Sequence, residues 1–99
     1  MPFAIIAHDG TDSEALTRRM KARPDHLAYT SQYQEHVCMA AALLNDSGVM
    51  HGSIMIVDFE TREAVEAWLE NEPYVKQGVW KHIEILPCAI APAFQKVVK

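Results

Sequence analysis

The chain has 99 residues, of which 49% are hydrophobic, so it holds enough material for one domain with a real core. Its formal net charge is -4, and it contains neither a basic stripe nor an apolar run of membrane-spanning length, which argues against nucleic acid and membranes as partners. The two cysteines lack C-x-x-C spacing, which favours free thiols and leaves a disulfide as an open alternative. The N-terminus shows no signal-peptide pattern, and together these observations predict a cytoplasmic protein.

The first half of the chain predicts a strand, a helical region and a second strand. Residues 3–8 (FAIIAH) are apolar and β-prone, which predicts the first strand. A helix is expected over 13–22, Pro24 marks a boundary, and the chain is expected to restart as a helix from 25 to about 35. Residues 37–44 (VCMAAALL) are the second strand candidate, although their alanines also favour helix.

The second half predicts a strand, a helix and a last strand. Residues 52–59 (GSIMIVDF) are apolar on both faces, so something other than a helix layer is expected to cover the second face. Residues 61–72 have the periodicity of an amphipathic helix, 73–80 are expected to turn, and 79–86 form the last strand. Residues 88–99 are expected to form a C-terminal tail that wraps over a neighbour or frays.

This order of elements is the βαββαβ pattern of a ferredoxin-like α+β sandwich with an antiparallel sheet. We expect a single domain over residues 1–99. Because helices cover only one face of such a sheet, the two-faced strand at 52–59 predicts a homodimer in which two sheets pack face to face as an α+β barrel.

Common motifs of metal and cofactor sites are missing from the sequence. The five histidines are scattered without H-x-x-x-H or H-E-x-x-H spacing, and there is no glycine-rich phosphate loop or G-x-S-x-G elbow. The sequence therefore predicts no metal and no organic cofactor.

Polar residues at strand ends and helix starts are the better candidates for chemistry. Asp9 follows the first strand, Arg19 borders the first helix face, His26 opens the second helix, Ser53 begins the two-faced strand, and Glu72 closes the third helix. Taken singly, each has an ordinary explanation as a turn residue, a solvated charge or an element boundary. In a ferredoxin-like fold they can converge on one edge of the sheet, which is the reason to consider them together.

Four segments resemble the YCII (YciI-like) family. They are AIIAHDG, ARPDHLAY, DSGVMHGSIMIVDF and ENEPYVKQGVWKHIEILP, and the resemblance spans roughly residues 3–87. It implies the dimeric ferredoxin-like barrel. It also implies a lyase-like, cofactor-independent activity, because family members with an assigned role include a dehydrochlorinase that acts on a chlorinated hydroxyhydroquinone.

The resemblance assigns roles to the polar residues. It places a general base at His26 and its carboxylate partner at Glu72, where the family has aspartate in an Asp-Pro-Tyr motif. It places an oxyanion-holding pair at Arg19 and Ser53, with Arg18 as the alternative if the helix register slips, and an arginine-orienting carboxylate at Asp9. The same motifs suggest substrate-binding or orienting roles for Arg23, Tyr29, Pro73 and Tyr74.

These roles predict proton abstraction from a small hydroxylated aromatic or enolisable substrate, followed by elimination as in a dehydrochlorinase. Two alternatives stay open. One is an isomerase or dehalogenase of aromatic-degradation intermediates on the same scaffold. The other is a non-catalytic module that binds a small molecule in the same pocket.

Overall fold

The computed structural model describes residues 1–95 of the chain. Its elements are, in order, β1 (Pro2–Asp9), α1 (Ala15–Gln32), β2 (Val37–Leu44), β3 (Met50–Asp58), α2 (Arg62–Glu70), α3 (Pro73–Lys76), β4 (Trp80–Pro87) and a 3-10 turn over Pro92–Phe94. The predicted ferredoxin-like α+β fold is confirmed.

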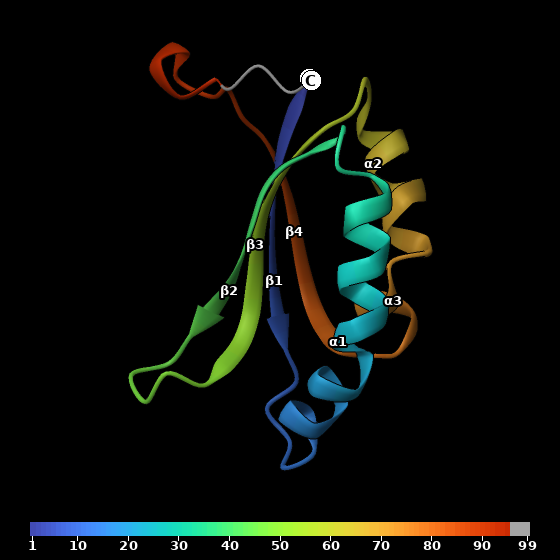
Figure 1. Ribbon diagram of the computed structural model, residues 1–99, viewed down its shortest axis with the longest axis vertical. Coiled ribbons are helices and arrows are strands. Elements are labelled where there is room, and N and C mark those ends of the chain that lie inside the picture. Colours follow the sequence, from blue (N-terminus) through green and yellow to red (C-terminus); the bar gives the residue numbers. More distant parts are fainter. Residues whose placement is uncertain (96–99) are drawn as a thin grey trace.

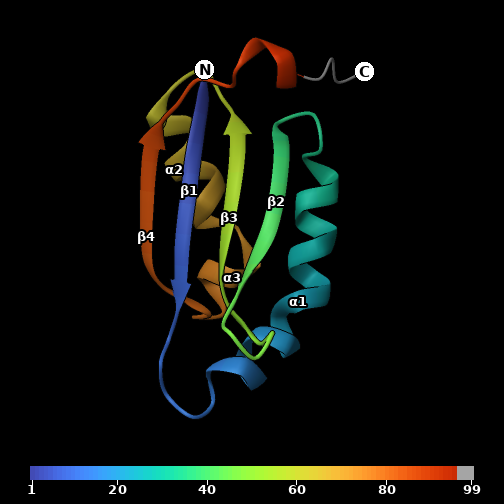
Figure 2. The same ribbon diagram turned by 90° about the vertical axis from the view of Figure 1, so that its left-hand side faces the viewer.

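The four strands form one antiparallel sheet in the order β2-β3-β1-β4. All three helices lie on the same face of this sheet, as Figure 1 shows edge-on. Figure 2 looks onto the opposite face, where the strands lie in front of α2 and α3 and no helix covers them. The sheet is therefore a two-layer structure with one open side.

The core lies between the sheet and the helices. Alternate residues of the central strands point into it, as period-two alternation requires. The buried hydrophobic side chains with less than 2% exposure include Ile5, Ala7, Met55, Val57, Val65 and Tyr74. The intervening residues Ile54 and Ile56 lie on the open face and are only partly exposed, so β3 is apolar on both faces, as expected from its sequence.

The predicted helix boundary at Pro24 is wrong, because α1 runs through the proline without a break. Proline removes one hydrogen bond of the helix and usually kinks it, and Figure 1 shows α1 changing direction in its first half. Pro24 itself is exposed, while Ala22 and His26 on the opposite face are buried against the core. Packing of that face therefore holds the helix together across the missing bond, and His26 lies within α1 rather than at its start.

The segment after α2 contains a short helix, α3, where the sequence predicted only a turn. Glu72 is its N-cap and Pro73 occupies the first helical turn, where the missing N–H of proline costs nothing. Gly78 then adopts φ +73, a conformation that glycine accepts more readily than other residues. These features fix the conformation of the turn, which places both Glu72 and Tyr74 in the interior.

The C-terminal segment leaves the sheet after β4. The backbone N–H of Cys88 still donates to the carbonyl oxygen of Pro2, and Phe94 further along is 74% exposed. The last four residues of the predicted tail, 96–99, lie outside the described residues. Within residues 1–95, each helix is too short or too polar to span a bilayer.

Candidate active site

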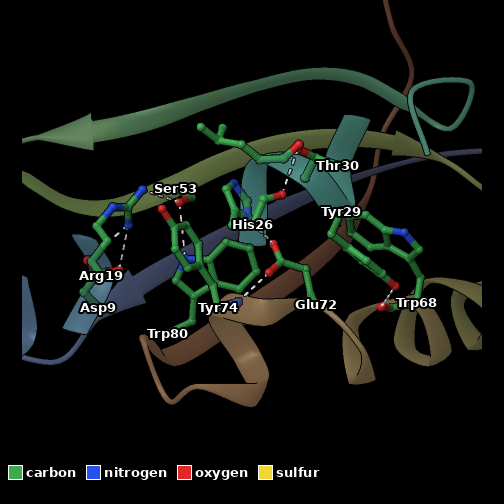
Figure 3. Close-up of polar contacts among 11 residues, drawn as sticks. Asp9, Arg19, His26, Tyr29, Thr30, Ser53, Trp68, Glu72, Tyr74 and Trp80 are labelled. Carbon is green, nitrogen blue, oxygen red and sulfur yellow. Dashed lines mark hydrogen bonds and ion pairs between the residues drawn. The ribbon is translucent and has the colours of Figure 1, made fainter. Parts of the chain in front are cut away.

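A cavity of about 140 Å³ lies between α1 and the β2–β3 half of the sheet. Its wall combines small apolar side chains with most of the polar residues singled out from the sequence. The lining residues are Arg19, Arg23, His26, Leu27, Ala40, Ala41, Ala42, Ser53, Met55 and Tyr74. Figure 3 shows the polar side chains of this region and their mutual contacts.

His26 and Glu72 are in hydrogen-bond contact. The Nδ1 atom of His26 lies 2.6 Å from Oε2 of Glu72, and the two side chains are 10% and 0% exposed. A carboxylate in this position accepts the Nδ1–H and thereby selects the tautomer whose Nε2 carries a lone pair. Because His26 lines the cavity, Nε2 is the ring nitrogen available for chemistry there.

Both oxygens of the Glu72 carboxylate have hydrogen-bond partners. Its Oε1 accepts the backbone N–H of Tyr74 at 2.6 Å, which is the N-cap contact of α3. Glu72 stands where the family motif has aspartate, and its side chain is long enough for one oxygen to cap α3 while the other contacts His26. A fully buried carboxylate needs such partners, because an unpaired buried charge is strongly unfavourable.

The Tyr74 ring lies between the histidine and the arginine. It stacks on His26 with ring centroids 3.9 Å apart and an interplanar angle of 8°, and the guanidinium carbon of Arg19 lies 4.7 Å from its centroid. Figure 3 shows the ring in this intermediate position. Burial raises the pKa of the Tyr74 phenol, although the nearby Arg19 and Arg23 oppose that shift, so the hydroxyl stays protonated at neutral pH.

Arg19 links β1 to β3 through its guanidinium. Its Nη1 donates to both carboxylate oxygens of Asp9 at 3.0 and 3.1 Å, and its Nη2 donates to Oγ of Ser53 at 2.9 Å. The Arg19 and Asp9 side chains are only 3% and 2% exposed, so this is a buried ion pair whose geometry is strongly constrained. Nε of Arg19 is buried and has no hydrogen-bond partner within residues 1–95.

The alternative of Arg18 in this role does not fit the geometry. Its guanidinium instead binds the Asp12 carboxylate at 2.8 and 3.2 Å and the carbonyl oxygen of Gly78 at 3.1 Å. The hydrogen bond from Arg18 lowers the pKa of Asp12 to about 2. Arg18 therefore ties the start of α1 to the turn before β4.

The remaining candidates divide into two groups. Arg23 is half-buried at the cavity, and none of the ion pairs formed within residues 1–95 involves it. Tyr29 does not line the cavity, because its hydroxyl donates to the carbonyl oxygen of Trp68 at 2.7 Å and its ring stacks on that tryptophan. Pro73 shapes the α3 turn rather than the cavity wall.

Trp80 is a site residue that sequence reasoning missed. Its Nε1 donates to Oγ of Ser53 at 3.2 Å, and its ring meets Tyr74 edge-on with centroids 5.4 Å apart. Strict alternation from His82, on the open face of β4, would place Trp80 on that same face. A register shift opposite Asp9 leaves Lys81 without a partner in β1, and Trp80 consequently turns toward the helices, where it is 5% exposed.

A second and larger cavity, of about 730 Å³, lies on the open face of the sheet beneath the C-terminal segment. Its described lining includes Cys38, Met39, Ile56 and Phe94 but neither histidine nor arginine. We place the candidate active site in the smaller cavity, because His26, Arg19 and Ser53 line it. Within residues 1–95, no three or more metal-ligating side chains of the His, Cys, Asp and Glu type are grouped closely enough to hold an ion.

Sequence comparison shows the family of the chain. The profile of the YCII-related domain matches residues 1–89. Protein YciI of Escherichia coli O6:H1 is 36% identical over 95 residues, covering 88% of this chain and 95% of that protein. An uncharacterized protein of Haemophilus influenzae is 28% identical with the same coverage.

Structural comparison agrees on the fold. The chain is similar to 5-chloro-2-hydroxyhydroquinone dehydrochlorinase (TftG) from Burkholderia phenoliruptrix AC1100, whose structure was solved in complex with 2,5-dihydroxybenzoquinone. The TM-score is 0.82, the identity is 24%, and the match covers 94% of this chain and 98% of that chain. At this identity the likeness establishes a common fold.

Proposed function

The chain belongs to the YCII-related domain family, and on this premise we propose that it is a cofactor-independent lyase that acts on a small hydroxylated aromatic compound. The observation that carries the proposal is the 2.6 Å contact between Nδ1 of His26 and Glu72, beside a cavity that Arg19 and Ser53 also line. The fold shared with TftG, a dehydrochlorinase, supports elimination as the reaction type.

His26 is the proposed general base. With its Nδ1–H held by Glu72, neutral His26 would accept a proton at Nε2 from a ring hydroxyl of the substrate. The Glu72 carboxylate would stabilise the imidazolium that results, as an acidic partner does in other histidine dyads. The stacked Tyr74 ring offers the imidazolium an electron-rich face as well.

Arg19 and Ser53 are the proposed oxyanion donors. The phenolate oxygen that forms when His26 takes the proton would be held by the Arg19 guanidinium and the Ser53 hydroxyl. Donors that are already in place before reaction contribute about 3 kcal/mol of barrier lowering each when the charge develops in a dry site. The Asp9 carboxylate would hold the Arg19 guanidinium in that orientation by accepting two hydrogen bonds from Nη1.

For a chlorinated hydroxyhydroquinone the steps balance as a loss of HCl. His26 removes a hydroxyl proton and returns it to the ring carbon that bears chlorine, so that this carbon becomes tetrahedral and the oxygen becomes a carbonyl. Loss of a second hydroxyl proton then pushes the electron pair toward that carbon and chloride departs. The products are a hydroxyquinone, a proton and chloride, and no oxidant is consumed.

Arg23 and Tyr74 are the proposed substrate-orienting residues. Arg23 lies one helical turn from Arg19, about 6 Å along the axis, so it would bind a second oxygen on the far side of the same ring. The Tyr74 hydroxyl, on a residue that lines the cavity, would donate a hydrogen bond to the substrate. Tyr29 is left out of the proposed site because of its position.

The proposal also includes a homodimer in the cytoplasm. Ile6, Ile54, Ile56 and the half-exposed Leu86 occupy the face of the sheet that no helix covers. A second copy packed sheet to sheet would bury this apolar face, as the two-faced β3 suggested. The two cysteines, which are unpaired within the described residues, fit a reducing compartment.

The direct test is chloride release from 5-chloro-2-hydroxyhydroquinone, measured with a chloride electrode while the quinone product is followed by its absorbance. We expect turnover by the wild type and none by His26→Ala, whose fold is checked by circular dichroism. Turnover by His26→Ala removes this histidine as the base. Binding of 2,5-dihydroxybenzoquinone without turnover of any chlorinated or unchlorinated quinol would instead make the protein a binding module.

A further inference from the structure

The Ser53 hydroxyl has two protein donors aimed at it. Nη2 of Arg19 donates to its oxygen at 2.9 Å and Nε1 of Trp80 donates at 3.2 Å. Both groups are donors only, whereas a serine hydroxyl has two lone pairs and one hydrogen. The two contacts therefore occupy both lone pairs of Ser53.

The hydrogen of the same hydroxyl has no protein acceptor among the described residues. Ser53 is 4% exposed and lines the cavity. With both lone pairs engaged by Arg19 and Trp80, the O–H bond is restricted to the remaining tetrahedral direction. A buried donor that is left unused is unfavourable, so this arrangement suits a ligand atom that accepts a hydrogen bond.

From this geometry we infer that Trp80 is a positioning residue, which together with Arg19 locks Ser53 as a donor toward an anionic or carbonyl oxygen of the substrate ring. This inference rests on the proposed function and adds which kind of substrate oxygen is preferred beside Arg19 and Ser53. A substrate hydroxyl can accept the Ser53 hydrogen through its oxygen, but its own proton finds no lone pair on Ser53 and must point elsewhere, as toward His26. A phenolate or quinone oxygen carries no such proton and is the stronger acceptor.

Trp80 is placed for this task by the irregularity in β4. The register shift that leaves Lys81 unpaired turns the indole inward beside Asp9 and Ser53. The same indole ring lies edge-on to His26 with centroids 6.0 Å apart. Trp80 thus connects the oxyanion donors to the base, and its N–H is the part of the side chain that a simple packing role does not require.

Trp68 provides a matched control. It is 5% exposed like Trp80, but its Nε1 is buried with no hydrogen-bond partner within residues 1–95. Trp68→Phe and Trp80→Phe therefore remove the same N–H and the same ring atoms from two equally buried positions, and only Trp80→Phe removes a contact to Ser53.

The first measurement is binding of 2,5-dihydroxybenzoquinone by titration calorimetry, because this compound carries ring oxygens of the selected kind. We expect Trp80→Phe to weaken binding about tenfold, and Trp68→Phe to leave it within about twofold. Because Trp80 acts through Ser53, the double variant Ser53→Ala/Trp80→Phe should bind no more weakly than Ser53→Ala alone. Equal affinity of Trp80→Phe and Trp68→Phe overturns the inference.

The second measurement needs no ligand. The chain has two tryptophans, so its ¹H–¹⁵N spectrum has two indole N–H signals, which Trp80→Phe and Trp68→Phe assign. We expect Ser53→Ala to move the Trp80 signal upfield and to leave the Trp68 signal in place. If the wild type does not bind 2,5-dihydroxybenzoquinone, the proposed substrate class fails, and this spectrum decides the role of Trp80: a moved signal supports it and an unmoved one overturns it.

Discussion

The carboxylate of Glu72 lies 2.6 Å from Nδ1 of His26, although 46 residues separate them in the chain. The same carboxylate accepts the backbone N–H of Tyr74, whose ring stacks on His26. Glu72, His26 and Tyr74 thus form one buried cluster, so any change to the carboxylate alters the surroundings of the imidazole.

Removing the charge of Glu72 should separate its proposed catalytic role from its structural one. Glu72→Gln keeps the size and one acceptor oxygen but loses the negative charge that stabilises an imidazolium. We expect kcat for chloride release to fall about 100-fold or more, with binding of 2,5-dihydroxybenzoquinone changed far less.

Glu72→Asp is the companion variant. It keeps the charge and an N-cap residue but is one methylene shorter, so we expect an intermediate rate. If Glu72→Gln keeps the wild-type rate, Glu72 is a structural cap only.

Arg23 should contribute binding without contributing stability. It is half-buried and no ion pair holds it within the described chain, so Arg23→Met leaves no buried carboxylate unpaired. We expect about tenfold weaker binding of 2,5-dihydroxybenzoquinone by calorimetry and an unchanged melting temperature. Lys21→Met, an exposed cation on the same helix, is the charge-matched control. Equal losses in both variants would assign the effect to overall charge.

Gly52 should tolerate no side chain. A Cβ at this position would lie 2.5 Å from the carbonyl oxygen of Ala7 and 3.1 Å from Cδ1 of Leu43. The oxygen belongs to the central strand and cannot move aside alone, so we expect Gly52→Ala to lower the free energy of unfolding by about 1–3 kcal/mol, as measured by urea denaturation. Wild-type stability would mean that β1 and β3 can separate locally, and that Ser53 is less rigidly held than its contacts indicate.

Alkaline pH should destabilise the protein through Tyr29. Burial, with a smaller contribution from Tyr33, raises the pKa of the Tyr29 phenol from 10.0 to about 12. The folded state therefore holds this proton more tightly than the unfolded state does. The associated stability is complete below pH 10 and is lost as pH rises from 10 to about 12.

Tyr29→Phe tests this assignment. The variant loses the hydrogen bond to the Trp68 carbonyl oxygen, which costs about 1 kcal/mol at neutral pH. It should then lose less further stability than the wild type between pH 10 and 12 in urea titrations. An identical pH slope in the two proteins would contradict the assignment.

The open face of the sheet should hold a second copy of the chain. Ile54 lies on this face between Ile6 of β1 and Ala41 of β2. We expect the wild type to sediment as a dimer and Ile54→Lys to sediment as a monomer, because a buried lysine without a partner is unfavourable. Met20→Lys, which replaces a 48% exposed residue of α1, should remain dimeric. A monomeric wild type contradicts the proposed barrel.

Local patterns determined the architecture of this protein. The order of apolar runs, turns and amphipathic periods predicts βαββαβ, because strand and helix periodicities are properties of neighbouring residues. The two apolar faces of β3 can also be read from the sequence, because its residues do not alternate between polar and apolar. Pro24 was misleading because its local cost is outweighed by packing of Ala22 and His26 against the core, and such packing is not visible in a local window.

Only the tertiary structure decided how the site is put together. That the glutamate in place of the family aspartate reaches both His26 and the α3 backbone depends on distances between elements far apart in the chain. The inward turn of Trp80 depends on a register shift between β1 and β4, which reverses the face that alternation assigns. Residue types and spacing can identify His26, Arg19 and Ser53 as candidates. The hydrogen-bond geometry across three strands and a helix decides which of their atoms are free to contact a substrate.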